Sequence, residues 1–223
     1  TCHSIPYILS ALGVFGLSVE AVRYIIPTHV HLDHAGGVGL LMDSCPNAEL
    51  IVHPYGARHM IDPTKLAAGA RSVYGDEAFE RLYGELIPVD KERFIEAPDD
   101  FEVLLGQRTL RFYDTPGHAK HHFCIHDLKS NTIFTGDTFG IAYDGTVVGS
   151  EPLIFVTTTP VQFDPEAMRN SIKRLLAINP SALNLTHFGQ VKPSQKVADQ
   201  LLKSIDAFVD IANESEALNN RTE

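Results

Sequence analysis

Four side chains that can bind a metal ion lie within six positions near the start of the chain: His29, His31, Asp33 and His34. They follow a short apolar run, residues 24–26, which predicts a buried strand. In an extended backbone alternate residues face the same way, so His29, His31 and Asp33 are expected to converge on one side, with His34 turned toward a neighbouring point. This spacing predicts that one cluster supplies ligands to two adjacent metal ions.

Three later segments, residues 115–118, 135–138 and 186–189, each place a further donor after a predicted strand. The donors are His118, Asp137 and His187. Loops at the ends of neighbouring strands are where α/β folds gather their active sites. Seven candidate ligands are therefore expected to reach one site from four loops.

Helix and strand patterns alternate along the chain, and this alternation predicts an α/β layered fold. The expected helices are residues 5–13 with Ser4 as N-cap, 18–22, 36–44, 165–178 with Asp164 as N-cap, and 194–212. The expected strands are residues 23–26, 49–52, 102–105, 108–113, 122–126, 132–135 and 182–185, with a hairpin at 102–113. Residues 54–83 predict two or three short helices that form a flap over a site.

Composition limits the classes of function. With 223 residues, 44% of them hydrophobic, the chain can bury one sizeable core, and we expect a single domain over residues 1–223 with a polar tail at 213–223. The formal net charge of −10 argues against nucleic acid or a membrane as a partner, because clustered Lys and Arg hold phosphate groups. The three cysteines form no Cys-x-x-Cys pair, which argues against a disulfide framework and favours a reducing, cytoplasmic location.

The ordered motifs His-x-His-x-Asp-His, Thr-Pro-Gly-His, Thr-Gly-Asp-Thr and Thr-His-Phe-Gly, between residues 29 and 189, resemble those of the metallo-β-lactamase-fold hydrolases, particularly the glyoxalase-II-like branch. The resemblance implies a four-layer αβ/βα sandwich that holds two divalent metal ions, with zinc favoured over iron or manganese. It also implies the ligand sets. Metal 1 is bound by His29, His31 and His118, metal 2 by Asp33, His34 and His187, and Asp137 bridges the two.

The same resemblance implies hydrolysis of a small-molecule ester, lactone or thioester by a hydroxide that bridges the metals, with Asp33 and Asp137 as catalytic residues. Antibiotic-cleaving lactamases typically lack a bridging carboxylate, so Asp137 argues against that activity. The absence of a basic C-terminal helix weakens the interpretation as a glutathione-thioester hydrolase. Two alternatives stay open, a phosphodiesterase of the same fold and a non-hydrolytic di-iron protein that binds oxygen or nitric oxide. The flavodiiron pattern has Glu where this chain has His31, which favours hydrolysis.

The start of the chain departs from the family pattern. Members normally place two or three strands before the first helix, and only 28 residues precede His29 here. We therefore expect upstream residues that complete the first sheet, because an open sheet edge promotes aggregation.

Side chains near the motifs allow two interpretations each. His122 completes a Thr-Pro-Gly-His-x-x-x-His pattern and would either support a metal ligand or simply pack in the core. Tyr143 would contact substrate or anchor its loop. Residues 157–160 are compatible with an edge strand or with a polar wall of the site, and Cys124 is expected to be a small core residue. The physiological substrate and the oligomeric state stay open.

Overall fold

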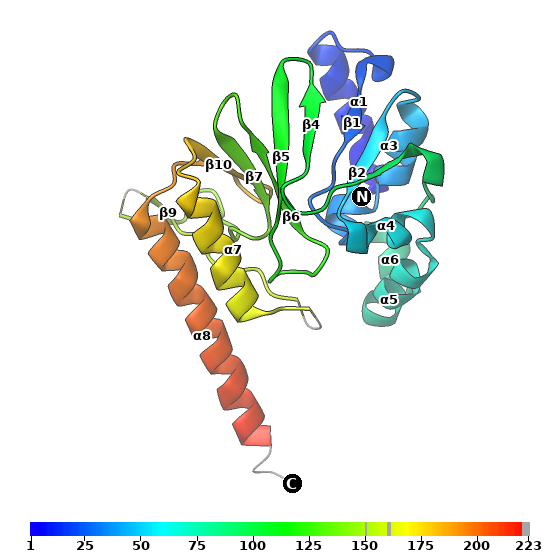
Figure 1. Cartoon of the computed structure of the whole chain (residues 1–223). Coiled ribbons are helices and arrows are strands. Elements are labelled where there is room, and N and C mark those ends of the chain that lie inside the picture. Colours follow the sequence, from blue (N-terminus) through cyan, green and yellow to red (C-terminus); the bar gives the residue numbers. More distant parts are fainter. Residues whose placement is uncertain (150, 160–161, 220–223) are drawn as a thin grey trace. The chain divides into compact units, whose positions relative to one another are not determined.

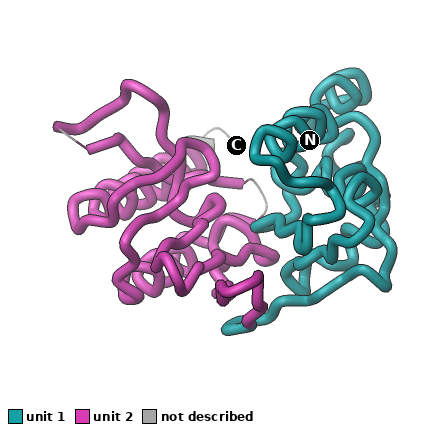
Figure 2. The backbone as a smooth tube through the Cα atoms, turned by 90° about the horizontal axis from the view of Figure 1, so that it is seen from above, with its two compact units in different colours: residues 1–101 teal, residues 102–223 magenta. Residues whose placement is uncertain are grey.

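The structure is a computed structural model that describes residues 1–149, 151–159 and 162–219. The chain forms two compact units, residues 1–101 and residues 102–223 (Figure 2). Each unit combines a β-sheet with helices (Figure 1), which confirms the predicted α/β class. None of the helices in the described part of the chain is long and apolar enough to cross a membrane.

Unit 1, residues 1–101, is built on a three-stranded parallel sheet in the order β1-β2-β3. Its strands are β1 (Tyr24–Ile25), β2 (Glu49–Val52) and β3 (Phe94–Glu96). Its helices are α1 (Ile5–Val14), α2 (Leu32–Ala35), α3 (Val38–Ser44), α4 (Pro54–Ile61), α5 (Thr64–Tyr74) and α6 (Asp76–Leu82), with 3-10 turns at Cys2–Ser4, Val19–Ala21 and Lys91–Arg93. The three helices α4 to α6 confirm the helices predicted for residues 54–83, while their role as a flap stays a prediction.

The core of unit 1 lies between its sheet and the helices that follow β1 and β2. Its buried side chains include Ile25, Val30, Val38, Met42, Leu50, Val52, Ala57 and Met60. At the end of α3 the guanidinium of Arg93 donates to the carbonyl oxygens of Met42 (3.0 Å), Cys45 (2.6 Å) and Ala48 (2.7 Å). The last carbonyls of a helix have no intrahelical partner, so Arg93 satisfies groups that would otherwise need water.

Unit 2, residues 102–223, contains a six-stranded mixed sheet in the order β11-β10-β7-β6-β5-β4. Its strands are β4 (Glu102–Leu105), β5 (Arg108–Asp114), β6 (Phe123–Asp127), β7 (Thr132–Gly136), β10 (Ala182–Leu185) and β11 (Gly189–Val191). Strands β4 to β7 are antiparallel neighbours, and β10 pairs parallel to β7. A separate two-stranded hairpin consists of β8 (Val147–Val148) and β9 (Glu151–Pro152).

Two long helices, α7 (Pro165–Ala177) and α8 (Gln195–Asn219), lie side by side on the six-stranded sheet (Figure 1). The shared core is formed by Met168, Ile172 and Leu175 of α7, Val197, Leu201 and Ile205 of α8, and sheet residues such as Cys124, Ile133 and Leu183. Asp164 caps α7 as predicted, because its Oδ1 accepts from the backbone N–H of Ala167 at 2.9 Å.

The first helix, α1, begins at Ile5 with Ser4 at the N-cap position, as predicted, although the Ser4 side chain makes no cap hydrogen bond and a 3-10 turn precedes the helix. One predicted helix end is wrong, because α8 continues beyond residue 212 to Asn219. The Glu, Ala and Leu residues in this stretch are good helix formers, so a polar composition does not end the helix there. Residues 220–223 lie outside the described residues.

Candidate metal centre

The histidine cluster of unit 1 lies between β1 and the first turn of α2. His31, the residue before α2, has extended backbone angles (φ −64°, ψ 149°), whereas Asp33 and His34 lie inside the helical turn. The predicted extended backbone is therefore wrong beyond His31. Helical spacing, and not strand alternation, places the last two donors of this cluster.

The four donors nevertheless lie together within unit 1. His29 Nε2 is 2.9 Å from His31 Nδ1, and the ring centroids of His29 and His34 are 4.1 Å apart. Asp33 Oδ2 is 3.2 Å from His34 Nε2. On the other side of its ring, His29 Nδ1 is 3.1 Å from Thr28 Oγ1. The Nε2 atom of His29 is thus the nitrogen that faces the cluster.

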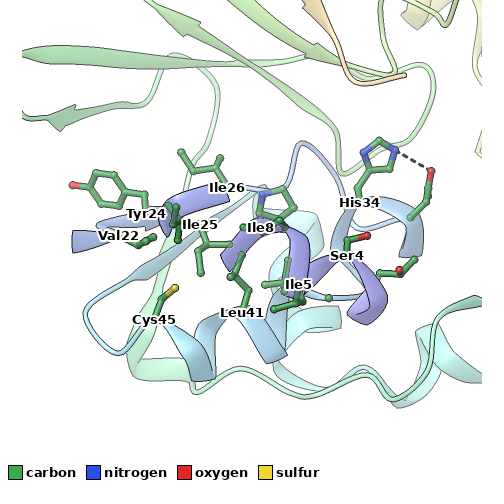
Figure 3. Close-up of a pocket in the computed structure, with 16 residues that line it drawn as sticks. Ser4, Ile5, Ile8, Val22, Tyr24, Ile25, Ile26, His34, Leu41 and Cys45 are labelled. Carbon is green, nitrogen blue, oxygen red and sulfur yellow. Dashed lines mark ion pairs between the residues drawn. The ribbon is translucent and has the colours of Figure 1, made fainter. Parts of the chain in front are cut away.

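An apolar cavity of about 390 Å³ borders this cluster (Figure 3). Its wall is mostly aliphatic, with Ile5 and Ile8 from α1 and Leu41 from α3 among the lining side chains. The ion pair of Asp33 and His34 lies on the same wall. The Asp33 side chain is 51% exposed, so its carboxylate is accessible to water or to a small molecule.

Tyr83, which follows α6, is a residue of unit 1 that the motifs do not reveal. Burial raises the pKa of Tyr83 to about 12, and a hydrogen bond with the neighbouring Tyr74 and the negative charge of Asp33 act in the same direction. The phenol therefore keeps its proton at neutral pH and can act as a hydrogen-bond donor. In the sequence, only its position at the end of residues 54–83, the predicted flap, could have indicated a role for Tyr83 beside the candidate ligands.

The three donors of unit 2 converge on the carboxylate of Asp137. His118 Nε2 is 3.5 Å from Asp137 Oδ2, and His187 Nε2 is 3.5 Å from Asp137 Oδ1. His118 and Asp137 are buried, whereas the His187 side chain is 41% exposed. Each histidine faces a different oxygen of the carboxylate, an arrangement that suits a carboxylate shared between two cations.

Helix α7 fixes the loop that carries His118. Ser171 Oγ of α7 donates to the carbonyl oxygen of Pro116 at 2.7 Å. The backbone N–H of Asp164 donates to the carbonyl oxygen of Gly117 at 2.8 Å. Gly117 has a φ of +134°, and a Cβ at this position would lie 2.4 Å from the Cα of Met168. Only glycine fits this close approach of loop and helix, which explains the glycine of the Thr-Pro-Gly-His motif.

His122 is fully buried and is hydrogen-bonded to the turn that carries Asp137. The backbone N–H of Asp137 donates to His122 Nε2 at 3.1 Å, so Nε2 has no proton and Nδ1 of the neutral ring carries it. Nδ1 lies 2.9 Å from Thr115 Oγ1 and 3.1 Å from Thr138 Oγ1. The Thr138 hydroxyl itself donates to the carbonyl oxygen of Thr115, so it can accept from this ring N–H.

Cys124 is a buried core residue, as predicted, and it also extends this network. Thr115 Oγ1 lies 3.3 Å from Cys124 Sγ, and the thiol donates to the carbonyl oxygen of Thr135 at 3.3 Å. Burial raises the pKa of the Cys124 thiol to about 12, so the thiol keeps the proton that it donates. All three cysteines of the chain are free thiols.

Tyr143 and Thr157 are two residues of segment 139–160 that bear on the predicted site. Tyr143 is 60% exposed, with its ring centroid 5.9 Å from that of Phe155, and its contact with a substrate stays a prediction. Thr157 lies outside any strand, and its Oγ1 is 2.8 Å from His118 Nδ1. Of the two interpretations of residues 157–160, a polar position beside a candidate ligand is therefore the correct one for Thr157. Pro160 lies outside the described residues.

The chemistry of the donor set fits divalent metal ions. The seven candidate ligands belong to histidine and aspartate groups that are able to hold a metal ion, four of them in unit 1 and three in unit 2. Imidazole nitrogen and carboxylate oxygen are ligands of zinc, iron and manganese alike. The donors thus indicate a class of metal without selecting one member.

Comparison with known proteins agrees with the motifs. The family model described as "Metallo-beta-lactamase superfamily" matches residues 4–187. The "Metallo-beta-lactamase fold-containing protein ST1585" of Sulfurisphaera tokodaii is 30% identical over 191 residues, which are 84% of this chain and 67% of that protein. The crystal structure of ST1585 from Sulfolobus tokodaii is similar to this structure with a TM-score of 0.68 at 30% sequence identity. The match covers 81% of this chain and 66% of the ST1585 chain.

Two further relatives carry enzyme names. The "N-acyl homoserine lactonase AttM" of Rhizobium johnstonii is 33% identical over 108 residues, or 48% of this chain and 36% of that protein. The "Acyl-coenzyme A thioesterase MBLAC2" of Gallus gallus is 27% identical over 128 residues, or 55% of this chain and 43% of that protein. The chain thus spans about two thirds of ST1585 and less than half of either enzyme.

Proposed function

We propose, from the premise that this chain belongs to the metallo-β-lactamase superfamily, that it is a metal-dependent hydrolase of esters, lactones or thioesters. The observation that carries the proposal is the pair of histidine Nε2 atoms, of His118 and His187, that face opposite oxygens of Asp137. A buried carboxylate between two imidazole nitrogens is costly to maintain unless a cation or a proton compensates its charge.

The proposed ligand sets follow the ordered motifs. His29, His31 and His118 would hold one divalent ion, zinc being favoured, and Asp33, His34 and His187 a second, with Asp137 bridging. When bound, such ions supply Lewis acidity, which lowers the pKa of a coordinated water to about 7 and stabilises negative charge that develops on a substrate oxygen. The assignment draws on both units, so it includes the prediction that residues 1–223 act as one domain and unfold in a single transition.

The residues of the chain have separate tasks in this proposal. Asp137 is buried and negatively charged, so it orients its histidine neighbours and offsets cationic charge. Asp33 has an accessible carboxylate and would orient the attacking water and accept its proton. Tyr83 keeps its proton and can donate a hydrogen bond near Asp33, where an oxygen of the substrate would need a donor.

An acyl substrate is favoured by two independent observations. The lactonase and thioesterase relatives act, by their names, on acyl compounds. In addition, the cavity beside Asp33 and His34 has a mostly aliphatic wall, which suits the apolar part of such a molecule better than a nucleotide.

The test is metal analysis together with a substrate panel. The purified chain, as isolated and after reconstitution with Zn, Mn or Fe, would be assayed on an acyl lactone, a thioester, an aryl ester and bis(p-nitrophenyl) phosphate. We expect bound metal, hydrolysis of at least one acyl compound and loss of this activity with a chelator. Asp137→Asn should lose metal and activity, whereas Asp144→Ala, an exposed aspartate of the neighbouring loop, should retain both.

Three outcomes would contradict the proposal. A protein that binds no divalent metal under any of these conditions would remove its basis. Full metal content and activity in Asp137→Asn would exclude the assigned bridge. A coloured iron protein that binds oxygen and hydrolyses nothing would favour the di-iron alternative.

A further inference from the structure

Thr157 is hydrogen-bonded to two of the candidate metal ligands in unit 2. Its Oγ1 lies 2.8 Å from Nδ1 of His118 and 3.2 Å from the backbone carbonyl oxygen of Asp137. The carbonyl oxygen of Thr157 is itself 3.5 Å from the same Nδ1 atom. One residue therefore contacts the far side of the His118 ring and the main chain of the aspartate.

The direction of each hydrogen bond follows from what the groups can donate. A carbonyl oxygen only accepts, so the single hydroxyl proton of Thr157 goes to the carbonyl of Asp137. The hydroxyl oxygen must then accept from His118 Nδ1, which therefore carries the proton of the neutral ring. The contact of Nδ1 with the Thr157 carbonyl requires the same assignment, because that carbonyl also can only accept.

We infer that Thr157 is a positioning residue that holds His118 in the Nδ1–H tautomer and leaves the Nε2 lone pair for a metal ion beside Asp137. Nε2 is the atom 3.5 Å from Asp137 Oδ2, so the lone pair lies on the side of the carboxylate. The metal-binding part of this inference depends on the proposed function, whereas the tautomer does not. Groups that orient a ligating histidine typically change metal affinity about 10- to 100-fold when they are removed.

The adjacent threonines provide matched control variants. Thr157→Val removes the hydroxyl with little change of shape, and Thr157→Ser restores it. Thr159 Oγ1 donates at 3.0 Å to the backbone oxygen of His118, so Thr159→Val controls for a general loosening of this segment. Thr158 is exposed, and Thr158→Val controls for the change of residue type.

The first measurement needs no metal. Nitrogen NMR of the metal-free protein distinguishes protonated from unprotonated ring nitrogens, and the His118 signals are identified by their loss in His118→Gln. We expect protonated Nδ1 and unprotonated Nε2 in the wild type, in Thr157→Ser and in both control variants. Thr157→Val should show a mixture of tautomers. A wild-type His118 with its proton on Nε2 would overturn the inference outright.

The second measurement is zinc affinity, determined by competition with a chelator for wild type and each variant. We expect Thr157→Val to bind one of two zinc ions about 10- to 100-fold more weakly, and Thr157→Ser and the controls to stay within about threefold of the wild type. Equal affinity of Thr157→Val and wild type, or equal weakening in Thr157→Val and Thr159→Val, would overturn the positioning role. A wild-type protein that binds none of Zn, Mn and Fe would instead refute the proposed function and leave the tautomer result standing.

Discussion

Two replacements of His122 distinguish the contributions of its two ring nitrogens, because asparagine and glutamine each reproduce one of them. The amide nitrogen of asparagine occupies the place of Nδ1, so His122→Asn can still donate to Thr115 or Thr138 but leaves the N–H of Asp137 without its acceptor. The amide oxygen of glutamine reaches the place of Nε2, so His122→Gln keeps that acceptor and loses the ring donor. The two variants therefore test which hydrogen bond matters more.

The magnitudes follow from burial. A buried donor that loses its acceptor costs about 1–3 kcal/mol, and the space left by the shorter side chain adds to this, so His122→Asn should lower the free energy of unfolding by about 2–4 kcal/mol. His122→Gln loses one ordinary hydrogen bond and should cost about 1 kcal/mol. For a chain of this size each kcal/mol corresponds to a decrease of about 2–4 °C in Tm.

Urea unfolding followed by circular dichroism measures these differences, since the chain has no tryptophan to report by fluorescence. The exposed His3 provides a control, and His3→Asn should stay within about 0.5 kcal/mol of the wild type. Equal losses in His122→Asn and His122→Gln would refute the assigned directions of the hydrogen bonds. A His122→Asn variant as stable as the wild type would refute the importance of the contact with Asp137.

Three further predictions concern unit 2. Asp164→Ala removes the acceptor for the N–H of Ala167 and should reduce the free energy of unfolding by about 1 kcal/mol in a urea titration. Gly117→Ala places a Cβ 2.4 Å from the backbone of Met168 at a positive φ, and it should reduce the soluble yield and Tm more than Asp164→Ala does. Burial raises the pKa of Asp127, but hydrogen bonds and a nearby arginine outweigh it, so the pKa is lowered overall. A lowered pKa stabilises the fold above the unfolded-state value of about 3.9 and this contribution is lost as the pH falls, so Asp127→Asn should differ from the wild type in unfolding free energy at about pH 6 and much less at about pH 3.

The sequence predicted most elements because their signals are local. Asp164 followed by proline starts α7, and the apolar spacing of α7 continues to Leu175. The short α2 carries no such signal, since four residues contain too few apolar positions to show a period. The sequence therefore does not predict the helical turn at Asp33 and His34. Composition was equally misleading for residues 213–219, where polar residues with good helix propensity continue α8.

The candidate ligands could be predicted from the sequence, whereas the residues that support them could not. A histidine or aspartate at a motif position is visible in one chain, but the role of a threonine depends on which atom lies opposite its hydroxyl. Thr138 lies 23 positions after Thr115, and Thr157 lies 19 positions after Thr138, so no short-range pattern connects them. Only the pairing of strands and the docking of α7 bring two of them to His122 and the third to His118.

Among these supporting hydrogen bonds, two connect the backbone N–H and the backbone carbonyl oxygen of Asp137 to side chains. Its N–H donates to His122, and its carbonyl oxygen accepts from Thr157. From His122 the hydrogen bonds continue through Thr115 and Cys124 to the carbonyl of Thr135, which belongs to the same turn. A network that begins with a group that only donates and ends at a group that only accepts has one consistent direction, so it holds this turn in a single arrangement. The entropic cost of ordering the backbone of Asp137 is therefore met during folding, and under the proposed function a cation would meet a carboxylate whose main chain is already fixed.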